Sequence, residues 1–190
     1  MLRSQAIGVI LIALIVMVYS TMTTKREIVV QKEYKTYSWL DSVDVTHYED
    51  YIKTYARYAI IEQEKHGIPA SITLAQGLLE SGSGQSKLAV IGNNHFGIKC
   101  FSKNCQKGHC MNYEDDSHKD FFRVYKSAYD SYLDHSQFLK KPRYRHLLEL
   151  SYYDYKGWAH GLKKAGYATD KRYPDKLIQI IEKYDLNEIQ

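Results

Sequence analysis

The most informative motif of the chain is Leu78-Leu79-Glu80-Ser81-Gly82-Ser83-Gly84. It places one carboxylate, Glu80, at the end of an apolar helix-forming run, and two glycines then end the helix. An acid at the rim of an apolar wall is partly desolvated, which raises its pKa. Such an acid can protonate the leaving oxygen of a sugar–sugar bond. The alternative is a solvated glutamate in the last helical turn, with Gly82 as the left-handed cap.

Three further motifs follow in the order Asn93–Lys99, Phe122–Tyr125 and Gly166–Asp170. Together with Gln76–Ser86 they resemble the bacterial endo-β-N-acetylglucosaminidase family, which includes autolysins and the muramidase-like domain of the flagellar rod cap. The matching blocks span residues 55–185, nearly all of the globular part of the chain. The resemblance implies an α+β, mainly α, lysozyme-like helical domain in which a small β-hairpin lobe flanks a glycan cleft.

The resemblance also implies catalytic roles. Glu80 matches the catalytic glutamate of the family, and Glu114-Asp115-Asp116 falls where members carry a second carboxylate in the hairpin lobe. We expect Glu114 to activate water and Asp116 to contact substrate, which would give inversion if the two carboxylates are far apart. Two alternatives stay open: the acetamido group of the substrate assists the reaction, or the acidic trio is a solvated turn.

Four other residues are candidates for the site. Tyr167 matches a tyrosine of the family that lies close to the cleaved bond, although it is also a candidate for packing in a chain with 18 tyrosines. Asn94 and Phe96 are expected to bind sugar on the floor of the cleft, with a core position as the alternative for Phe96. Gln76 lies one helical turn before Glu80, on the same face, and is expected to orient it.

The N-terminus carries a targeting signal. Arg3 precedes the apolar run Ala6–Val18, which fits the core of a secretory signal better than a span of about 20 residues. The sequence therefore predicts a signal or membrane-anchor segment over residues 1–22, a polar stalk over 23–45 and a glucosaminidase domain over 46–190. An exported protein at the cell envelope is expected, and the sequence does not decide whether the segment is cleaved.

The apolar spacing of the domain predicts helices separated by glycine and proline. A helix from Thr46 should end at Gly67, and Pro69 should begin the helix that carries Glu80. Ser127 should cap the next helix, which runs to Leu139. Further elements are expected as a hairpin within 104–124, a helix beginning near Arg143, a helix over 154–165 that ends at Gly166, and a helix over 173–184 with Leu177, Ile178, Ile180 and Ile181 in the core.

The cysteines have competing interpretations. Export favours a disulfide that joins Cys100 to either Cys105 or Cys110 and leaves one thiol over. Cys100, Cys105, His109 and Cys110 could instead form a zinc site, although their spacing is not one of the common short ligand pairs. A cysteine nucleophile paired with His95 or His109 is a third interpretation. The sequence favours the disulfide, with no metal and no cofactor.

The composition is that of a folded domain, with 44% apolar and 25% charged residues. The net charge of +4 suits an anionic polymer, and no phosphate-binding loop or helix-turn-helix pattern indicates nucleic acid. We therefore expect a peptidoglycan hydrolase that cleaves the β-1,4 bond between N-acetylglucosamine and N-acetylmuramic acid. Its rivals are a muramidase or lytic transglycosylase on the same fold, and a wall-binding module without turnover.

Overall fold

The computed structural model describes residues 46–100, 108–113 and 120–189. The chain divides into two compact units, Met1–Asp41 and Ser42–Gln190, and the described residues belong to the second. The expected signal or anchor over 1–22 and the stalk over 23–45 lie outside them. The described elements are α2 (Thr46–His66), α3 (Ala70–Ser81), α4 (Lys87–Gly92), β1 (Cys110–Tyr113), β2 (Asp120–Arg123), α5 (Ala128–Leu139), η1 (Arg145–Glu149), α6 (Tyr155–Lys164), α7 (Tyr173–Lys183) and η2 (Leu186–Glu188).

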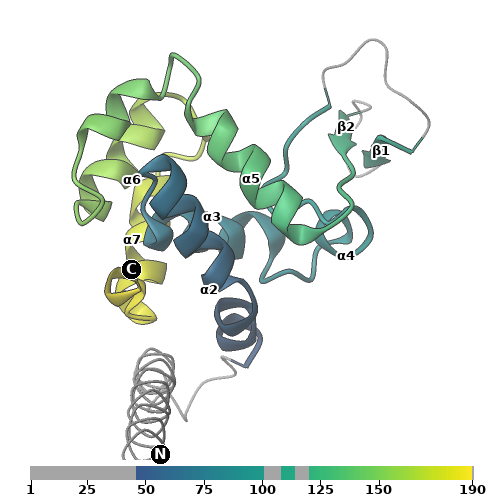
Figure 1. The fold of residues 1–190 in the computed structure, drawn as a ribbon, viewed down its shortest axis with the longest axis horizontal. Coiled ribbons are helices and arrows are strands. Elements are labelled where there is room, and N and C mark those ends of the chain that lie inside the picture. The colour runs from purple at the N-terminus through teal and green to yellow at the C-terminus, as the bar shows by residue number, and fades with distance from the viewer. Residues whose placement is uncertain (1–45, 101–107, 114–119, 190) are drawn as a thin grey trace, which may run out of the picture. The chain divides into compact units, whose positions relative to one another are not determined.

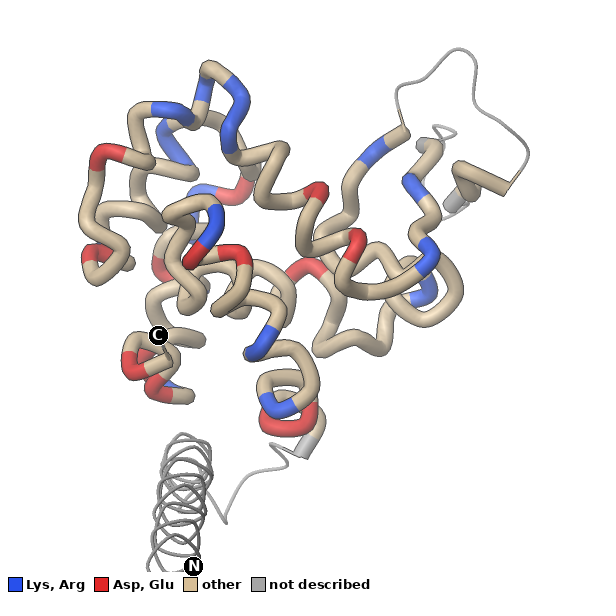
Figure 2. Tube along the Cα trace, viewed as in Figure 1, with Lys and Arg blue, Asp and Glu red and all other residues tan. Residues whose placement is uncertain are grey.

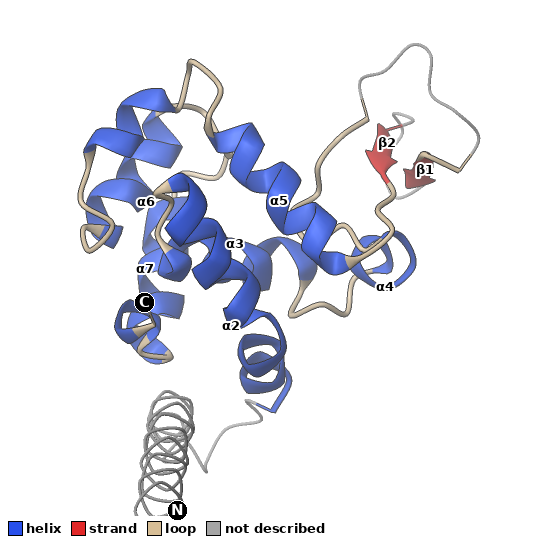
Figure 3. Ribbon diagram, in the orientation of Figure 1, coloured by secondary structure: helices blue, strands red, loops and turns tan. Residues whose placement is uncertain are grey.

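Helix α3 is the centre of the helical body. It packs against α2, α6 and α7, and its residues 70–78 are all buried (Figures 1 and 3). Pro69 precedes it and Gly82 ends it in the left-handed conformation, at φ 55°. Burial on all sides explains why the helix is apolar all round, since a surface helix would show one apolar stripe. The bounds predicted for α2 and α3 are confirmed.

The hairpin lobe has two antiparallel strands, as the sequence predicted. Cys110 pairs with Arg123, and Tyr113 pairs with Asp120. Lys99 adds an isolated antiparallel bridge to Phe122, so β2 is also bonded to the chain that follows α4. This lobe lies beyond the N-terminal end of α5 (Figure 1).

The remaining helices follow the predicted signals with two differences. Ser127 and Asp130 form a capping box at the start of α5, and Asp154 caps α6. The helix expected near Arg143 is a short 3₁₀ turn, η1. On α7 the prediction placed four apolar residues in the core, but only Leu177 and Ile181 are buried, because i, i+4 spacing keeps one face inward. Ile178 and Ile180 are half-buried.

Charge and hydropathy complete the picture of the body. Basic and acidic residues are interspersed over the helices and the hairpin lobe (Figure 2). Across the described ranges, no helix combines the length and the apolar character needed to cross a membrane.

Candidate active site

Glu80 stands at the C-terminal end of α3, where buried helix meets solvent. Its side chain is exposed, although the residues that precede it are buried. The turn after it is fixed, because the Gly84 amide donates to the Ser81 hydroxyl at 2.7 Å. Desolvation by the surrounding protein raises the pKa of the Glu80 carboxyl, and a hydrogen bond from Tyr173 partly opposes this shift. The carboxyl is therefore open to a ligand and holds its proton to higher pH than an ordinary glutamate.

A chain of hydrogen bonds orients this acid. Gln76 Nε2 donates to the Tyr173 hydroxyl at 2.9 Å, and that hydroxyl donates to Glu80 Oε1 at 3.2 Å. Gln76 itself is fully buried. It lies on the same helical face as Glu80, as predicted, but its contact with the acid runs through Tyr173. Sequence reasoning missed Tyr173, whose only signal was its place in the first turn of an amphipathic helix.

Tyr167 lies next to this chain. Its ring stacks on Tyr173 with centroids 5.7 Å apart, and it also contacts His135 and Phe138 at 6.2 and 6.1 Å. Burial raises the pKa of the phenol well above its ordinary value, and the negative charge of Glu80 raises it further. Tyr167 is half-buried, and it lies close enough to Glu80 for the charge of that carboxylate to raise the pKa of the phenol. This position suits the predicted role, which remains a prediction.

The structure places Asn94 and Phe96 in the interior, and their role in binding sugar stays a prediction. Asn94 is buried, and its amide donates to the carbonyls of Ile98 and Arg123 at 3.0 and 2.9 Å while accepting from the Ile98 amide at 3.0 Å. These bonds make Asn94 an anchor between the segment after α4 and the end of β2. Phe96 is only 4% exposed and stacks on His135 at 4.0 Å, so it is a core residue. A motif of polar and aromatic residues is as typical of a sugar-binding surface as of a packed interior. Only the burial of the side chains in the fold distinguishes these two roles.

A buried tyrosine network ties α3 to the segment that contains Asn94. The Tyr51 hydroxyl bonds to the Tyr132 hydroxyl at 2.9 Å and to His95 Nδ1 at 3.0 Å. Tyr51 also approaches Gly77 so closely that a Cβ there would collide with its hydroxyl. Burial lowers the pKa of His95 to about 4, so the ring is neutral at physiological pH. Gly77 is therefore needed to seat this network against the helix that carries Glu80.

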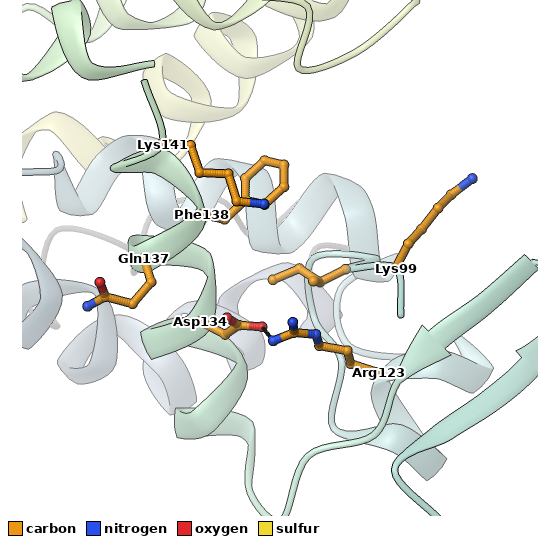
Figure 4. A pocket seen from close by; sticks show the side chains of 7 residues that line it. Lys99, Arg123, Asp134, Gln137, Phe138 and Lys141 are labelled. Carbon is orange, nitrogen blue, oxygen red and sulfur yellow. Dashed lines mark hydrogen bonds and ion pairs between the residues drawn. The ribbon is translucent and has the colours of Figure 1, made fainter. Parts of the chain in front are cut away.

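A pocket of about 110 Å³ lies between α5 and the hairpin lobe. Its lining includes three cationic side chains and one acid (Figure 4): Lys99, Arg123, Lys141 and Asp134. Arg123 pairs with Asp134 at 2.6 Å, and the Lys141 ammonium lies 4.1 Å from the centre of the Phe138 ring. Since Phe138 also contacts Tyr167, rings connect this pocket to the surroundings of Glu80. No sequence motif indicates this pocket, because its residues come from three separate segments.

Two predicted features fall partly or wholly outside the described residues. Glu114 and Asp116 both lie outside them, so their role as second carboxylates remains a prediction. Cys100 is joined to Cys110 by a disulfide, which is one of the two pairings expected, and Cys105 lies outside. Within the described ranges, the one group of side chains with the composition of a metal site is Cys100, His109 and Cys110.

Comparison with known proteins agrees with this geometry. Residues 56–186 match the glucosaminidase family described as mannosyl-glycoprotein endo-beta-N-acetylglucosaminidase. The exo-glucosaminidase LytG of Bacillus subtilis is 35% identical over 162 residues, which are 78% of this chain and 55% of that protein. The peptidoglycan hydrolase FlgJ of Vibrio parahaemolyticus is 30% identical and is matched over 72% of this chain and 47% of its own length. The chain thus spans about half the length of these curated relatives.

Solved structures give the same result for the fold. The glycoside hydrolase domain of Salmonella typhimurium FlgJ superposes with a TM-score of 0.60 at 30% identity, covering 73% of this chain and 88% of that domain. The N-acetylmuramoyl-L-alanine amidase structure from Staphylococcus aureus gives a TM-score of 0.65 at 31% identity, covering 77% of this chain and 44% of that one. The expected fold class, a mainly helical lysozyme-like domain with a small hairpin, is confirmed. On the family match, this chain belongs to the glucosaminidase family of glycoside hydrolases.

Proposed function

We propose that this protein is a peptidoglycan hydrolase that cleaves the β-1,4 bond between N-acetylglucosamine and N-acetylmuramic acid, with Glu80 as the general acid. The observation that carries the proposal is the state of the Glu80 carboxyl. It is exposed at the end of a buried helix, and desolvation raises its pKa. An acid that holds its proton to higher pH than an ordinary glutamate is better suited to protonate the leaving oxygen of a glycosidic bond.

The other groups near Glu80 have supporting roles. Tyr173 fixes the rotamer of the acid from its buried side, which leaves Oε2 for the substrate. Tyr167 places a phenol beside the carboxyl, where it can hydrogen-bond the acetamido group of a sugar or orient a water. The phenol stays protonated at neutral pH because burial and the charge of Glu80 both raise its pKa. It can therefore donate a hydrogen bond throughout the reaction.

The second catalytic group is Glu114 or the acetamido group of the substrate. Among the described residues, no other carboxylate contributes to the pKa shift of Glu80. Asp134 and Asp170 are occupied by ion pairs with Arg123 and Lys176. The candidates for the second group are the hairpin acids of residues 114–116 and the acetamido group of the substrate itself.

The pocket beside Phe138 binds the acidic part of the substrate. Lys141 adds positive charge beside the Arg123–Asp134 pair, which favours an anion in the pocket. Peptidoglycan carries carboxylates on the lactyl group of muramic acid and on its stem peptides, whereas the glycan backbone of chitin is neutral. The apolar face of the Phe138 ring suits a sugar that lies against it. These features together favour a wall glycan as the substrate.

The site of action is the cell envelope, where peptidoglycan lies. The relatives named as peptidoglycan hydrolases support this proposal. The N-terminal segment, residues 1–22, would export the domain and hold it at the membrane. Fractionation of cells that express the full chain, with and without residues 1–22, tests this part: loss of the segment should leave the protein in the cytoplasm.

Mass spectrometry of purified peptidoglycan after digestion tests the function. Reduced products that end in N-acetylglucosamine support the proposal. Ends in N-acetylmuramic acid would identify a muramidase, and anhydro ends a lytic transglycosylase. The length of the products distinguishes cleavage within a glycan strand from cleavage at its end. Cleavage at the end is what the name of the Bacillus relative, an exo-glucosaminidase, specifies. The Glu80→Gln variant is the control for background hydrolysis, and an absence of any new ends would favour a binding module.

A further inference from the structure

We propose that Cys100, His109 and Cys110 form a binding site for Zn²⁺ when the two cysteines are thiols, as an alternative to their disulfide. The site lies in the hairpin lobe, and nothing in the proposed activity requires it. Its three potential ligand atoms all lie within 4.8 Å of one another. Thiolate sulfur and imidazole nitrogen are the ligands that zinc prefers in proteins.

The separations fit one tetrahedral ion. With bonds of about 2.3 Å to sulfur and 2.0 to 2.1 Å to nitrogen, two ligands of one zinc lie roughly 3.6 to 3.8 Å apart. Cys110 Sγ and His109 Nδ1 are 3.9 Å apart. The Cα atoms of Cys100 and Cys110 are 6.1 Å apart, so their side chains can converge on one point. Small rotations of the side chains would therefore complete the coordination without a change of backbone.

One strand holds the backbone of all three ligands. The Cys100 amide donates to the Phe121 carbonyl at 2.7 Å, Cys110 pairs with Arg123, and the Val124 amide donates to the His109 carbonyl at 3.0 Å. The ligands are thus positioned before any ion arrives, which lowers the entropy cost of binding. Cys100 and Cys110 are half-buried and His109 is exposed, so an ion can reach the site from solvent.

The two states of the site differ in chemistry but have a shared effect. An external dithiol reduces the disulfide to two thiols and is itself oxidised to a disulfide. Zinc binding then releases the two thiol protons to solvent, forms two Zn–S bonds and one Zn–N bond, and transfers no electrons. It leaves the fourth tetrahedral position to water. Either the metal or the disulfide would link Cys100 to Cys110 and so hold the bridge of Lys99 to Phe122 in place. Because Lys99 lines the pocket described above, both states would stabilise the wall of that pocket.

The test uses the full chain, kept reduced with a phosphine. Zinc content is measured by elemental analysis, and Co²⁺ is titrated as a spectroscopic probe, since thiolate-to-cobalt charge transfer reports sulfur ligands. We expect about one zinc per chain in the wild type, and a higher melting temperature with zinc than after chelation. The His109→Gln variant should bind at least roughly tenfold more weakly, a loss of about 1.4 kcal/mol.

Matched variants keep the outcome decisive. Cys100→Ser should lose both the zinc and the charge-transfer band, while His160→Gln, an exposed histidine on α6, should keep both. His109→Gln leaves both cysteines intact, so it remains informative even if Cys100→Ser fails to fold. Absence of zinc and of a cobalt band in the reduced wild type would overturn the proposal. Equal zinc in the wild type and in His109→Gln and Cys100→Ser would do the same.

Discussion

The helical body and the hairpin lobe are built by different means. In the body, α3 is surrounded by other helices, and its position depends on apolar packing. In the lobe, besides the short ladder of β1 and β2, the chain is held by single polar or covalent links: the Asn94 amide, the Arg123–Asp134 pair and the Cys100–Cys110 bridge. Phe121 of that strand remains 48% exposed. The position of the acid therefore depends on the packing of a buried helix, whereas the position of the lobe depends on a few individual links.

The hairpin acids give the largest effect expected in the lobe. Glu114→Gln should lower turnover by about 10²-fold or more if this residue is the general base. Asp115→Asn and Asp116→Asn serve as matched variants and should have smaller effects. Rates of wall digestion with proteins of equal melting temperature provide the comparison. Activity near wild type in all three variants would remove the general-base role and favour substrate assistance.

Tyr173→Phe tests how the body orients the acid. The lost hydrogen bond should cost about 1 kcal/mol of stability. That bond favours the charged form of Glu80, so its loss should raise the pKa of the acid. Activity that requires the protonated acid falls as pH rises through this pKa, so the alkaline limb of the pH–rate profile should move to higher pH. Tyr167→Phe should lower turnover without moving the limb. If the alkaline limb of the pH–rate profile does not move in Tyr173→Phe, Tyr173 does not influence the pKa of Glu80 and only packs against its neighbours.

Lys141→Met tests the pocket of the lobe. An exposed charge pair is worth up to about 1 kcal/mol, so KM for peptide-bearing wall fragments should rise about two- to fivefold. The value of kcat should hold, and the difference should shrink at high salt. The matched variant Lys140→Met changes an exposed neighbour that does not line the pocket. An equal loss on peptide-free glycan would contradict an anion-binding role.

How much the sequence could predict differs between the two regions. Helical spacing, Pro69 and Gly82 predicted the position of Glu80, because these are local signals. The burial of Asn94 and Phe96 could not be predicted, because the Asn94 hydrogen bond to Arg123 and the Phe96 stacking on His135 join segments far apart in the chain. Tyr173 and the pocket depend on the same kind of contact. Sequence patterns report the local backbone and the apolar faces, whereas the partners of buried polar groups appear only in the fold.

His135→Phe should have the smallest effect. His135 is buried against Phe96, and neither of its ring nitrogens has a hydrogen-bond partner among the described residues. Burial lowers its pKa to about 3, whereas the unfolded chain takes up the proton near pH 6.5. Stability therefore falls as pH drops from about 6.5 toward 3. The variant should match wild type near pH 7 and lose less stability at pH 5 in urea unfolding. Equal losses in both proteins would contradict the buried, neutral ring.

The most direct test of the account is the rate of wall digestion by folded Glu80→Gln, compared with wild type at the same melting temperature. Glutamine keeps the shape of the side chain and removes the proton, so the rate should fall by about 10²-fold or more. Glu64→Gln, an exposed glutamate on α2, is the matched control and should digest at the wild-type rate. If Glu80→Gln folds and keeps most of its activity, Glu80 is not the general acid.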